Sequence, residues 1–182
     1  MGVLRSLAAC IVAALLVCGD VHAAAGEYQV KAVFLFNFSR FVEWPESAFA
    51  APDAPFVIGV FGHDPFGSEL DDATRGETVN GRPLVVRKVH DAAEAAACQI
   101  LFLHRSEAAR MDEILATLDH RSTLTVSDLE EAAKRGAMIA LVTENNRIRL
   151  RVNVDSARAA HLTISSKLLR TAEIIDAPTE GK

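Results

Sequence analysis

His63-Asp64 is a pair of adjacent residues whose types are suited to acid-base chemistry in this 182-residue chain. The pair directly follows an apolar run, residues 56–61, and open α/β sheets bind ligands at such strand ends. An imidazole beside a carboxylate can act as acid, base or metal ligand. However, neighbouring residues of a turn point in different directions, and Asp64-Pro65 is ordinary turn chemistry. We favour a turn and keep ligand contact as the alternative.

A second polar pair, Ser127-Asp128, follows the short apolar strand expected over residues 123–126. The loops after parallel strands lie at one edge of a sheet, so this pair and the loop of residues 62–67 could line one small-ligand site. In a simpler interpretation, Ser127 caps a helix over residues 128–135. The sequence leaves both interpretations open.

Three arginines, Arg147, Arg149 and Arg151, alternate with apolar residues near the end of the chain. Strict alternation predicts a strand with one buried face and one wet face. Three guanidinium groups on one strand face could bind a phosphate or a carboxylate. More often such a face pairs with carboxylates of neighbouring helices and protects an edge strand from aggregation, which is the interpretation we favour.

The sequence lacks the motifs of the common catalytic and metal sites. It has no phosphate-binding loop, no dinucleotide-binding glycine pattern after the first strand, no nucleophile elbow, no zinc-protease motif and no Cys-x-x-Cys. The other histidines beyond the N-terminal segment have no metal-ligand spacing, and we expect them at solvated ends of elements: His90, His104, His120 and His161. We therefore expect no catalytic residue, no metal and no cofactor, and a protein that is not an enzyme.

Charge and cysteine content narrow the classes of partner. The formal net charge of −5 gives no reason to expect nucleic acid or an anionic membrane surface. Cys98 is the one cysteine beyond residue 18, and it begins an apolar run. We expect a buried, inert thiol, with an intermolecular disulfide as the alternative.

The first 23 residues have the order of a secretory signal peptide. A single positive charge at Arg5 precedes an uncharged apolar run over residues 7–18, and a small-residue pattern ends at Ala23. The run is shorter than the roughly 20 residues that span a bilayer, so we expect no permanent anchor. Lipoprotein processing at Cys18 and a helix that belongs to the fold are the alternatives. We expect cleavage after Ala23 and a periplasmic mature protein.

Residues 28–43 carry apolar side chains at steps of three and four, which is the period of a helix. Phe34, Phe38 and Phe41 share this spacing, so we expect them to face the domain's own core. Trp44-Pro45 should end the helix, because the residue before proline avoids the helical region.

The apolar surface of this helix is wider than one core needs. Leu35 and Phe36 lie well round the helix from Phe38, and a helix that is apolar on most sides is buried or shared with a second protein. The residues that we expect to contact a partner or a second subunit are Leu35, Phe36 and Trp44.

The rest of the chain alternates short apolar runs with helical segments. Strands are expected over residues 56–61, 84–89, 99–103, 123–126, 137–142 and 147–154. Helices are expected over residues 68–74, 91–97, 106–118 with Ser106 as its cap, 128–135, 155–160 and 165–175. Strands separated by helices favour a parallel sheet, and Asn145-Asn146 favours a hairpin at its end.

We therefore predict an α/β fold with one domain. Its sheet is mostly parallel, covered by helices, has about five to six strands and ends in an antiparallel hairpin. The expected organisation is a signal peptide over residues 1–23, the α/β domain over residues 24–175 and a polar tail over residues 176–182.

An ordered series of segments links the chain to a known family. The segments are Lys-Ala-Val-Phe-Leu-Phe-Asn-Phe at 31–38, Phe-Val-Glu-Trp-Pro at 41–45, Phe-Val-Ile-Gly-Val at 56–60, Asp-Pro-Phe-Gly at 64–67, 79–84, 98–102, 124–128, 136–139 and 164–169. Together they cover residues 27–170 and resemble the YfiR family of periplasmic proteins.

The resemblance implies a regulator that is not a catalyst. It implies a periplasmic repressor that acts as a homodimer and binds the sensor region of a membrane-bound diguanylate cyclase, which restrains cyclic-di-GMP synthesis. Internal disulfides belong to that pattern, but Cys98 has no second cysteine to pair with in the mature chain. Redox control through such disulfides therefore does not carry over.

Two hypotheses for the function follow. In the first, a periplasmic, dimeric regulatory protein docks onto an inner-membrane signalling protein, and it should expose an apolar patch on the helix of residues 28–43. In the second, a small-ligand binding domain uses His63, Asp64, Ser127 and Asp128, and it should show a pocket with convergent polar groups at the strand ends.

Overall fold

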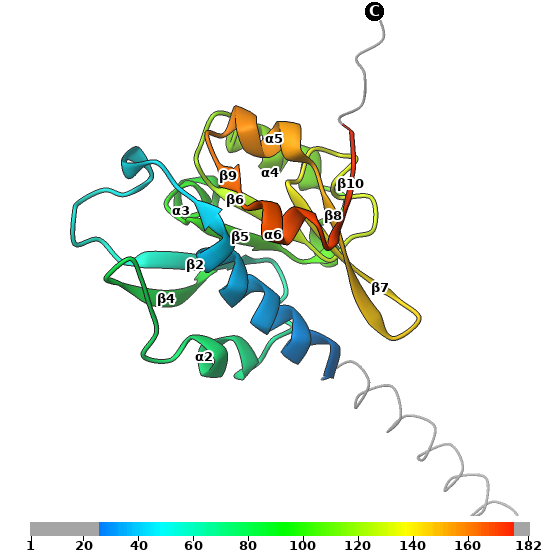
Figure 1. Ribbon diagram of the computed structural model, residues 1–182, viewed down its shortest axis with the longest axis horizontal. Helices are drawn as coiled ribbons and strands as arrows, with labels where there is room; N and C mark the ends of the chain where they lie inside the picture. Colours follow the sequence, from blue (N-terminus) through cyan, green and yellow to red (C-terminus); the bar gives the residue numbers. More distant parts are fainter. Residues whose placement is uncertain (1–25, 177–182) are drawn as a thin grey trace, which may run out of the picture.

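Apolar runs and helices alternate along the chain, and in the computed structural model, which describes residues 26–176, they build a sheet covered by helices on both faces (Figure 1). The predicted α/β fold with a mostly parallel sheet is confirmed. The predicted signal peptide, its cleavage site after Ala23 and most of the predicted polar tail lie outside the described residues.

The main sheet has eight strands within the described residues, in the order β10-β8-β7-β6-β5-β2-β4-β3. Their bounds are β2 Phe56–Phe61, β3 Thr78–Val79, β4 Arg82–Val89, β5 Ile100–Leu103, β6 Leu124–Ser127, β7 Ile139–Glu144, β8 Arg147–Val152 and β10 Ala172–Ile174. Antiparallel pairing occurs between β7 and β8 and between β3 and β4, whereas the other neighbours are parallel. A separate antiparallel pair joins β1 (Val42–Glu43) to β9 (Thr163–Ile164).

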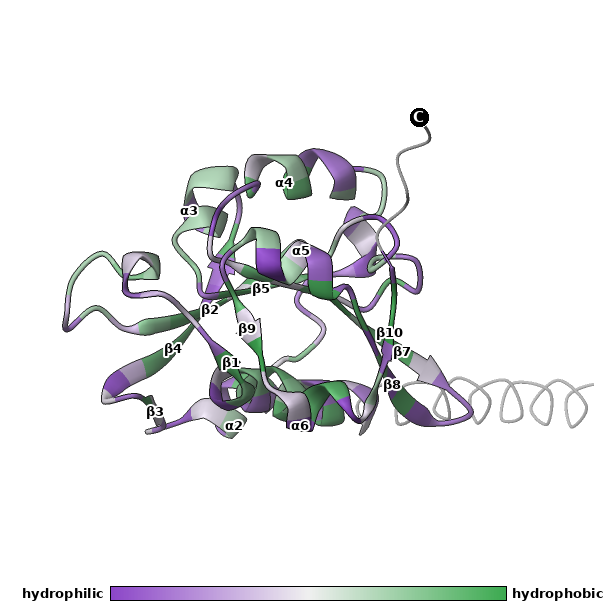
Figure 2. Cartoon of the chain, turned by 45° about the horizontal axis from the view of Figure 1, so that its top comes forward, coloured by the Kyte–Doolittle hydropathy of each residue, from purple (hydrophilic) through white to green (hydrophobic). Residues whose placement is uncertain are grey.

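The helices form two layers on the sheet. Their bounds are residues 26–41 for the N-terminal helix, α2 Glu69–Thr74, α3 Ala92–Ala96, α4 Met111–Thr117, α5 Val154–Ala159 and α6 Ser166–Leu169, with 3₁₀ turns η1 Glu46–Ala48 and η2 Arg105–Glu107. Figure 2 shows α3 and α4 on one side of the sheet and the N-terminal helix, α2 and α6 on the other. The central strands β2, β5 and β6 are fully buried, which explains their continuous apolar runs.

The hairpin between β7 and β8 follows the predicted turn. Asn145 and Asn146 both have positive φ, 50° and 58°, which asparagine tolerates better than most residues and which a tight hairpin turn requires. The six predicted strands correspond to β2, β4, β5, β6, β7 and β8. The sheet is wider than predicted, because the short strands β3 and β10 extend it at both margins.

Three predicted helices differ from the structure. Residues 128–135 form a series of turns, since the Ser127 hydroxyl accepts only from the Leu129 N–H and no helical ladder follows. The helix predicted from Ser106 begins at Met111, and Ser106 belongs to η2. The helix predicted over residues 165–175 ends at Leu169, because β10 instead pairs with the open side of β8.

The N-terminal helix turns a different face inward from the one predicted. Its buried residues are Lys31, Ala32, Leu35, Phe38 and Ser39, at the expected steps of three and four. Leu35 is therefore core and not a contact residue, because its side chain is completely enclosed. Of the predicted core residues Phe38 is buried, whereas Phe34 and Phe41 are only partly covered. Within residues 26–176, no helix has the length and apolar composition that crossing a bilayer requires.

Candidate functional site

A cluster of charged and polar side chains lies at the carboxyl edge of the central strands. β6, β5 and β2 are neighbours in the sheet, so the residues that follow them meet at one edge. Asp128 follows β6, His104 follows β5 and His63 follows β2. The N-terminal helix adds Tyr28 and Lys31 from the layer above. We call this group, with Glu27 and Arg105, the anchor cluster.

Asp128 is the centre of the anchor cluster. Its carboxylate is completely buried and accepts from the Tyr28 hydroxyl at 2.6 Å, from the Arg105 backbone N–H at 2.7 Å and from the Arg105 Nε at 2.8 Å. Lys31 Nζ lies 3.9 Å from the same carboxylate. Three donors on one carboxylate satisfy most of its hydrogen-bonding capacity. Asp128 therefore ties the N-terminal helix to the ends of β5 and β6.

Lys31 completes this attachment from the inner face of the helix. Its side chain is fully buried and donates to Glu27, one helical turn earlier. Arg105 lies 3.4 Å from the same Glu27 carboxylate. Two cations and two carboxylates thus alternate in one network, which is the arrangement that makes buried charge tolerable.

The pKa values of the cluster reflect its burial and its pairing. Burial alone would raise the pKa of Asp128, but the hydrogen bonds from Tyr28 and Arg105 outweigh it and hold that pKa below the ordinary 3.8. Burial lowers the pKa of Lys31 and that of His104, although nearby carboxylates oppose the effect. At neutral pH the cluster therefore combines an ionised carboxylate with a neutral imidazole.

The two histidines of this edge are neighbours. The rings of His63 and His104 have centroids 5.2 Å apart, and His104 Nε2 lies 3.8 Å from the Asp128 carboxylate. His104 Nδ1 accepts from the Ser106 N–H at 3.1 Å, which caps η2. His104 was expected at a solvated strand end, but only 12% of its side chain is exposed. His63 is exposed, so it lies at the rim of the cluster.

Two of the predicted ligand-binding residues have local structural roles. Asp64 accepts from the Phe66 N–H at 3.0 Å within its own turn and points toward Lys88, 3.6 Å away. Ser127 donates to the Leu103 carbonyl at 2.7 Å in the interior of the sheet. His63 and Asp128 thus lie at one edge of the sheet with His104 between them, whereas Asp64 and Ser127 lie outside the cluster.

The anchor cluster has the properties of a structural tie. Among the described residues, no group of three or more histidine, cysteine, aspartate or glutamate side chains is placed to hold a metal ion. The described buried side-chain nitrogen and oxygen atoms all have hydrogen-bond partners. The groups of the cluster are mutually satisfied, so what the arrangement does is to fix the position and rotation of the N-terminal helix.

The predicted arginine stripe divides into two parts. Arg151 is largely covered and pairs with three carboxylates, those of Glu130, Glu144 and Glu173. Arg147 and Arg149 are exposed on the same strand. Arg151 thus pairs with carboxylates, as the favoured interpretation expected. However, β8 is an interior strand and not an edge, because β10 pairs with it.

Cys98 occupies the environment of an inert thiol. It is 3% exposed, its Sγ lies 3.3 Å from the Glu94 carbonyl, and burial raises its pKa to about 11. A thiol that stays protonated at neutral pH is a poor nucleophile and a slow partner in disulfide exchange.

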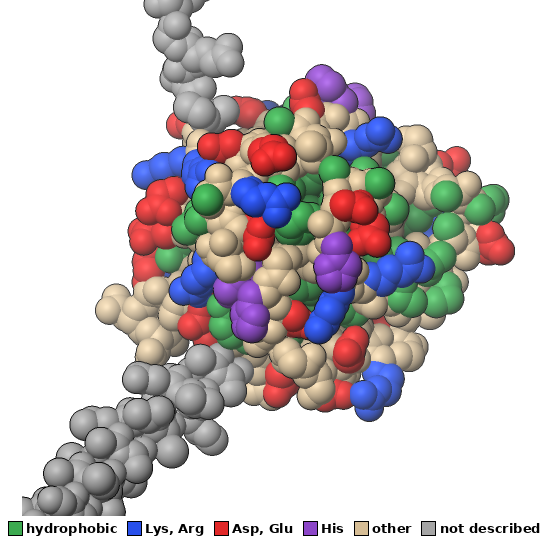
Figure 3. Space-filling model, turned by 180° about the vertical axis from the view of Figure 1, so that it is seen from behind, with side chains coloured by type: hydrophobic (Ala, Val, Ile, Leu, Met, Phe, Trp, Pro, Cys, Tyr) green, Lys and Arg blue, Asp and Glu red, His purple; other side chains and the backbone are tan. Residues whose placement is uncertain are grey.

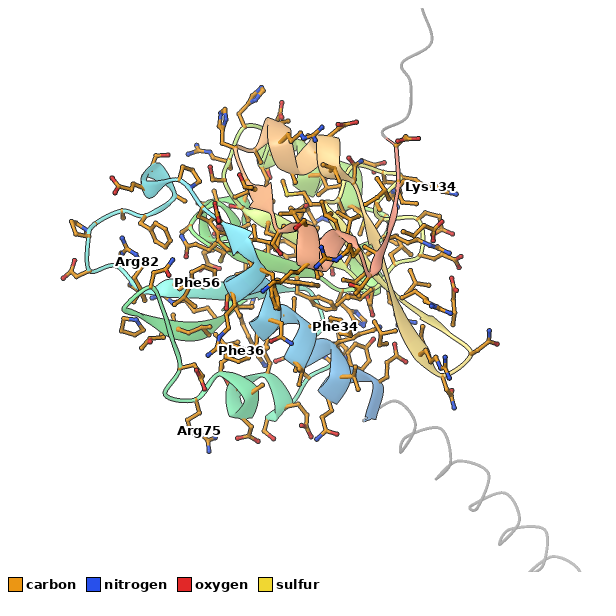
Figure 4. All side chains as sticks on the ribbon, in the orientation of Figure 1. Phe34, Phe36, Phe56, Arg75, Arg82 and Lys134 are labelled. Atoms are coloured by element: carbon orange, nitrogen blue, oxygen red, sulfur yellow. The ribbon has the colours of Figure 1, made fainter. Side chains whose placement is uncertain are left out.

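The outward side of the N-terminal helix carries an apolar stripe. Val30 and Val33 are 46% and 47% exposed, and Phe34 and Phe41 are half-buried beside them at helical spacing. We call these four residues the outer face. Figure 4 shows Phe34 and Phe36 on opposite sides of the helix, so Phe36 does not belong to this face.

The other predicted contact residues are engaged within the domain. The Arg40 guanidinium lies over the Phe36 ring, 4.5 Å from its centroid. The Trp44 indole donates to the Gln99 carbonyl at 3.1 Å and packs edge-on against Phe56. Both side chains are half-buried, so a smaller fraction of each is exposed than of Val30 and Val33.

The sequence did not predict that Val30 and Val33 are exposed, nor that most residues of the anchor cluster meet. One signal was present: Lys31, Leu35 and Phe38 share one helical stripe, so burial of Leu35 and Phe38 carries Lys31 inward. A lysine on the buried side of a helix calls for an acidic partner at the sheet edge. Once that side is inward, Val30 and Val33 must point outward.

Comparisons with known proteins agree with this fold. A family model described as YfiR/HmsC-like matches residues 28–173. No protein with a curated description matches the chain. Among solved structures, the crystal structure of a conserved domain protein from Vibrio cholerae O1 biovar El Tor str. N16961 is similar, with a TM-score of 0.50 and 14% sequence identity over 65% of this chain. The match covers 54% of that chain, about half its length, and shows a shared fold. On the extent of the family match, the chain belongs to the YfiR/HmsC-like family.

Proposed function

We propose that this protein is a periplasmic regulator that docks its outer face onto the sensor region of an inner-membrane signalling protein. Membership of the YfiR/HmsC-like family supports a role in diguanylate cyclase signalling, so a membrane-bound diguanylate cyclase is the candidate partner. The observation that carries the proposal is the exposure of Val30 and Val33 on a helix whose opposite side is core. Exposed apolar surface of this kind is the usual material of interfaces.

The anchor cluster supports the same proposal. Covering apolar side chains gains about 25 cal/mol for each Å² removed from water. Such a gain is largest when the surface is already held in its binding conformation. Asp128 and Lys31 fix the rotation of the N-terminal helix, so Val30 and Val33 are presented without further ordering of the backbone.

We also propose that the regulator acts as a homodimer. Phe36 on the N-terminal helix and Trp44 just after β1, both half-buried, remain the candidates for contact with a second subunit. Light scattering of the mature protein distinguishes a dimer from a monomer directly.

A small-ligand binding domain is less well supported. That hypothesis relied on His63, Asp64, Ser127 and Asp128 converging on one pocket. Asp64 and Ser127 instead bond within their own loop and sheet, and Asp128 is occupied by Tyr28 and Arg105. Of these four residues His63 alone is exposed, so the regulatory proposal fits the geometry better.

The proposal is tested by measuring cyclic-di-GMP in cells. Deletion of the gene should raise the cyclic-di-GMP level, and the wild-type protein should restore it. Val33→Asp should fail to restore it although it accumulates normally, because a charge on the outer face would have to be desolvated at the interface. Ile174→Asp is the matched control, since Ile174 is similarly exposed at 48% but lies on β10, and it should restore the level. An unchanged cyclic-di-GMP level in the deletion strain would contradict the proposal.

A further inference from the structure

The outer edge of β4 has no neighbouring strand over most of its length. β3 pairs with β4 only at Arg82 and Pro83, after which the Leu84 N–H reaches the Glu77 carbonyl at 3.0 Å. Within residues 26–176, no backbone hydrogen bond joins residues 85–89 to another segment on this side. Figure 2 shows β4 near the margin of the sheet. Such an edge presents a row of N–H and C=O groups that an added strand can pair with.

Two adjoining hollows lie beside this edge, on the face that α3 covers. The larger, of about 370 Å³, is lined by residues of the 47–55 segment, most of them apolar, together with Val57, Arg87 and Ala97. The smaller, of about 170 Å³, shares these three residues and reaches Cys98. α3, which covers this face, has only five residues, and four of them are alanine, so its side chains fill little space. This part of the face is therefore under-filled.

Arg87 places a positive charge beside both hollows, although the net charge of the chain is negative. Arg87 and Lys88 are both exposed on β4, and Arg87 forms no ion pair with any residue that the structure describes. Lys88 lies 3.6 Å from Asp64. Glu94 also lines the smaller hollow, but its carboxylate accepts from the His90 N–H at 2.8 Å, beyond the end of β4. Figure 3, which views the molecule from behind, shows basic, acidic and apolar side chains interspersed on that side.

We propose that the free edge of β4 binds an extended acidic segment of a partner protein by strand addition. The backbone of the segment pairs with residues 85–89, an apolar side chain enters the hollow over Val57 and Ala97, and a carboxylate faces Arg87. This surface is separate from the outer face of the N-terminal helix, which belongs to the opposite layer, so the inference does not depend on the proposed function.

Charge selects this occupant over a second copy of the chain. Two β4 strands paired edge to edge would bring together the Arg87 and Lys88 side chains of both copies, and like charges across a strand pair are destabilising. Cations on an edge strand also discourage non-specific pairing, but that role needs no apolar hollow beside them. The hollow and Arg87 lie on one face of the sheet, so together with the unpaired backbone they match one extended chain that carries an apolar and an acidic residue two positions apart.

The probe is a capped heptapeptide, Thr-Val-Thr-Glu-Thr-Val-Thr, whose valine and glutamate side chains share one face of an extended strand. Hydrogen exchange of the mature protein, followed residue by residue by NMR, should show slower exchange for amides within residues 85–89 when the peptide is present. The same peptide with lysine in place of glutamate should give no protection, nor should one with N-methylated backbone amides. Hexanoate, which can fill the hollow but cannot pair with the edge, should leave exchange at residues 85–89 unchanged.

Two substitutions complete the test. Arg87→Glu should weaken peptide binding about tenfold or more, whereas Arg149→Glu, a charge reversal at another exposed strand arginine, should not. Thermal melts of both variants check that the fold is intact. The inference is overturned if about 1 mM peptide, which would detect even binding with a Kd near 1 mM, protects none of residues 85–89. Equal binding by Arg87→Glu, or protection that maps to the N-terminal helix, would also overturn it.

Discussion

Asp128 shows how one side chain can position a whole element. It accepts from Tyr28, 100 residues earlier in the chain, and from Arg105, 23 residues earlier, and it is completely buried. The sequence singled out Asp128 for its place after a strand, but not for this role. The role depends on Lys31 and Tyr28 arriving from the N-terminal helix, and no local pattern encodes that long-range meeting.

Removing the charge of Asp128 should destabilise the domain. Asp128→Asn removes the buried one of the two carboxylates that Arg105 and Lys31 face, and loss of one partner of a buried pair costs about 3 kcal/mol. Urea unfolding at neutral pH measures this loss. Asp119→Asn changes an exposed aspartate and should stay within about 0.5 kcal/mol of wild type. Equal stability of the two variants would contradict the anchoring role.

The stability of the domain should depend on pH through two groups of the anchor cluster, His104 and Asp128. The pKa of His104 is lowered in the folded state, so the unfolded chain binds protons more readily and stability falls as the pH drops below 6.5. The pKa of Asp128 is also lowered, so its contribution is complete above pH 3.8 and is lost as the pH falls below that value. Urea midpoints measured between about pH 2 and 7 should show both losses of stability. Asp128→Asn should reduce the loss that occurs below pH 3.8. A wild-type stability that rises on acidification through pH 6.5 would refute this assignment.

Gly59 is a second residue whose identity is required by its neighbours. A Cβ at this position would lie 2.6 Å from Cys98 Sγ and 2.7 Å from Val89 Cγ2. Gly59→Ala should therefore destabilise the domain by about 1–3 kcal/mol through overpacking. Cys98→Ala alone should cost roughly 1 kcal/mol, because it removes one small buried group.

The double variant separates this clash from other effects. Removing Sγ makes room for the new methyl group, so Gly59→Ala should cost less in a Cys98→Ala background. Gly26→Ala is the control, since no atom lies within 4 Å of a Cβ there, and it should leave stability nearly unchanged. Strict additivity in thermal or urea unfolding would argue against the steric account.

At the scale of the element, the sequence predicted the interior strands well and the margins poorly. β2, β5 and β6 are buried on both faces, so their apolar runs stand out. β3 and β10 have two and three residues, and they exist as strands because a neighbour offers a free side to pair with. Tertiary pairing of this kind leaves no period in the sequence.

The rotation of the N-terminal helix could not be predicted from its apolar pattern. Phe34, Leu35, Phe36 and Phe38 occupy several sides, so hydrophobicity alone allows more than one inward face. The buried charge of Lys31 removes that ambiguity, because only one rotation brings it beside Asp128. The polar contact therefore selects the face, and the apolar contacts supply most of the stability.

Two aspartate substitutions on this helix should separate its inner and outer faces. Phe38→Asp buries an unpaired charge among the sheet side chains and should cost several kcal/mol, enough to unfold the domain or nearly so. Val33→Asp places the charge in solvent and should change stability by about 0.5 kcal/mol or less. Circular dichroism melts of both variants make the comparison. A Val33→Asp domain as unstable as Phe38→Asp would show that Val33 is core.

At the scale of the whole molecule, the two helix layers have different roles. The layer with α3 and α4 encloses an apolar cluster that includes Val57, Leu101 and Met111. The layer with the N-terminal helix encloses the larger cluster and also presents the outer face, with the anchor cluster between helix and sheet. The domain thus combines a buried sheet with an apolar surface whose orientation the anchor cluster fixes, and this arrangement is compatible with the proposed docking role.

The central claim is that the outer face makes the contact with the signalling partner. The most direct test is calorimetric titration of the mature protein with the purified periplasmic sensor region of a membrane-bound diguanylate cyclase from the same cells. We predict saturable binding by wild type and by Ile174→Asp, and binding at least about tenfold weaker by a folded Val33→Asp. Wild-type binding that Val33→Asp leaves unchanged would contradict the claim, as would no binding by the wild-type protein.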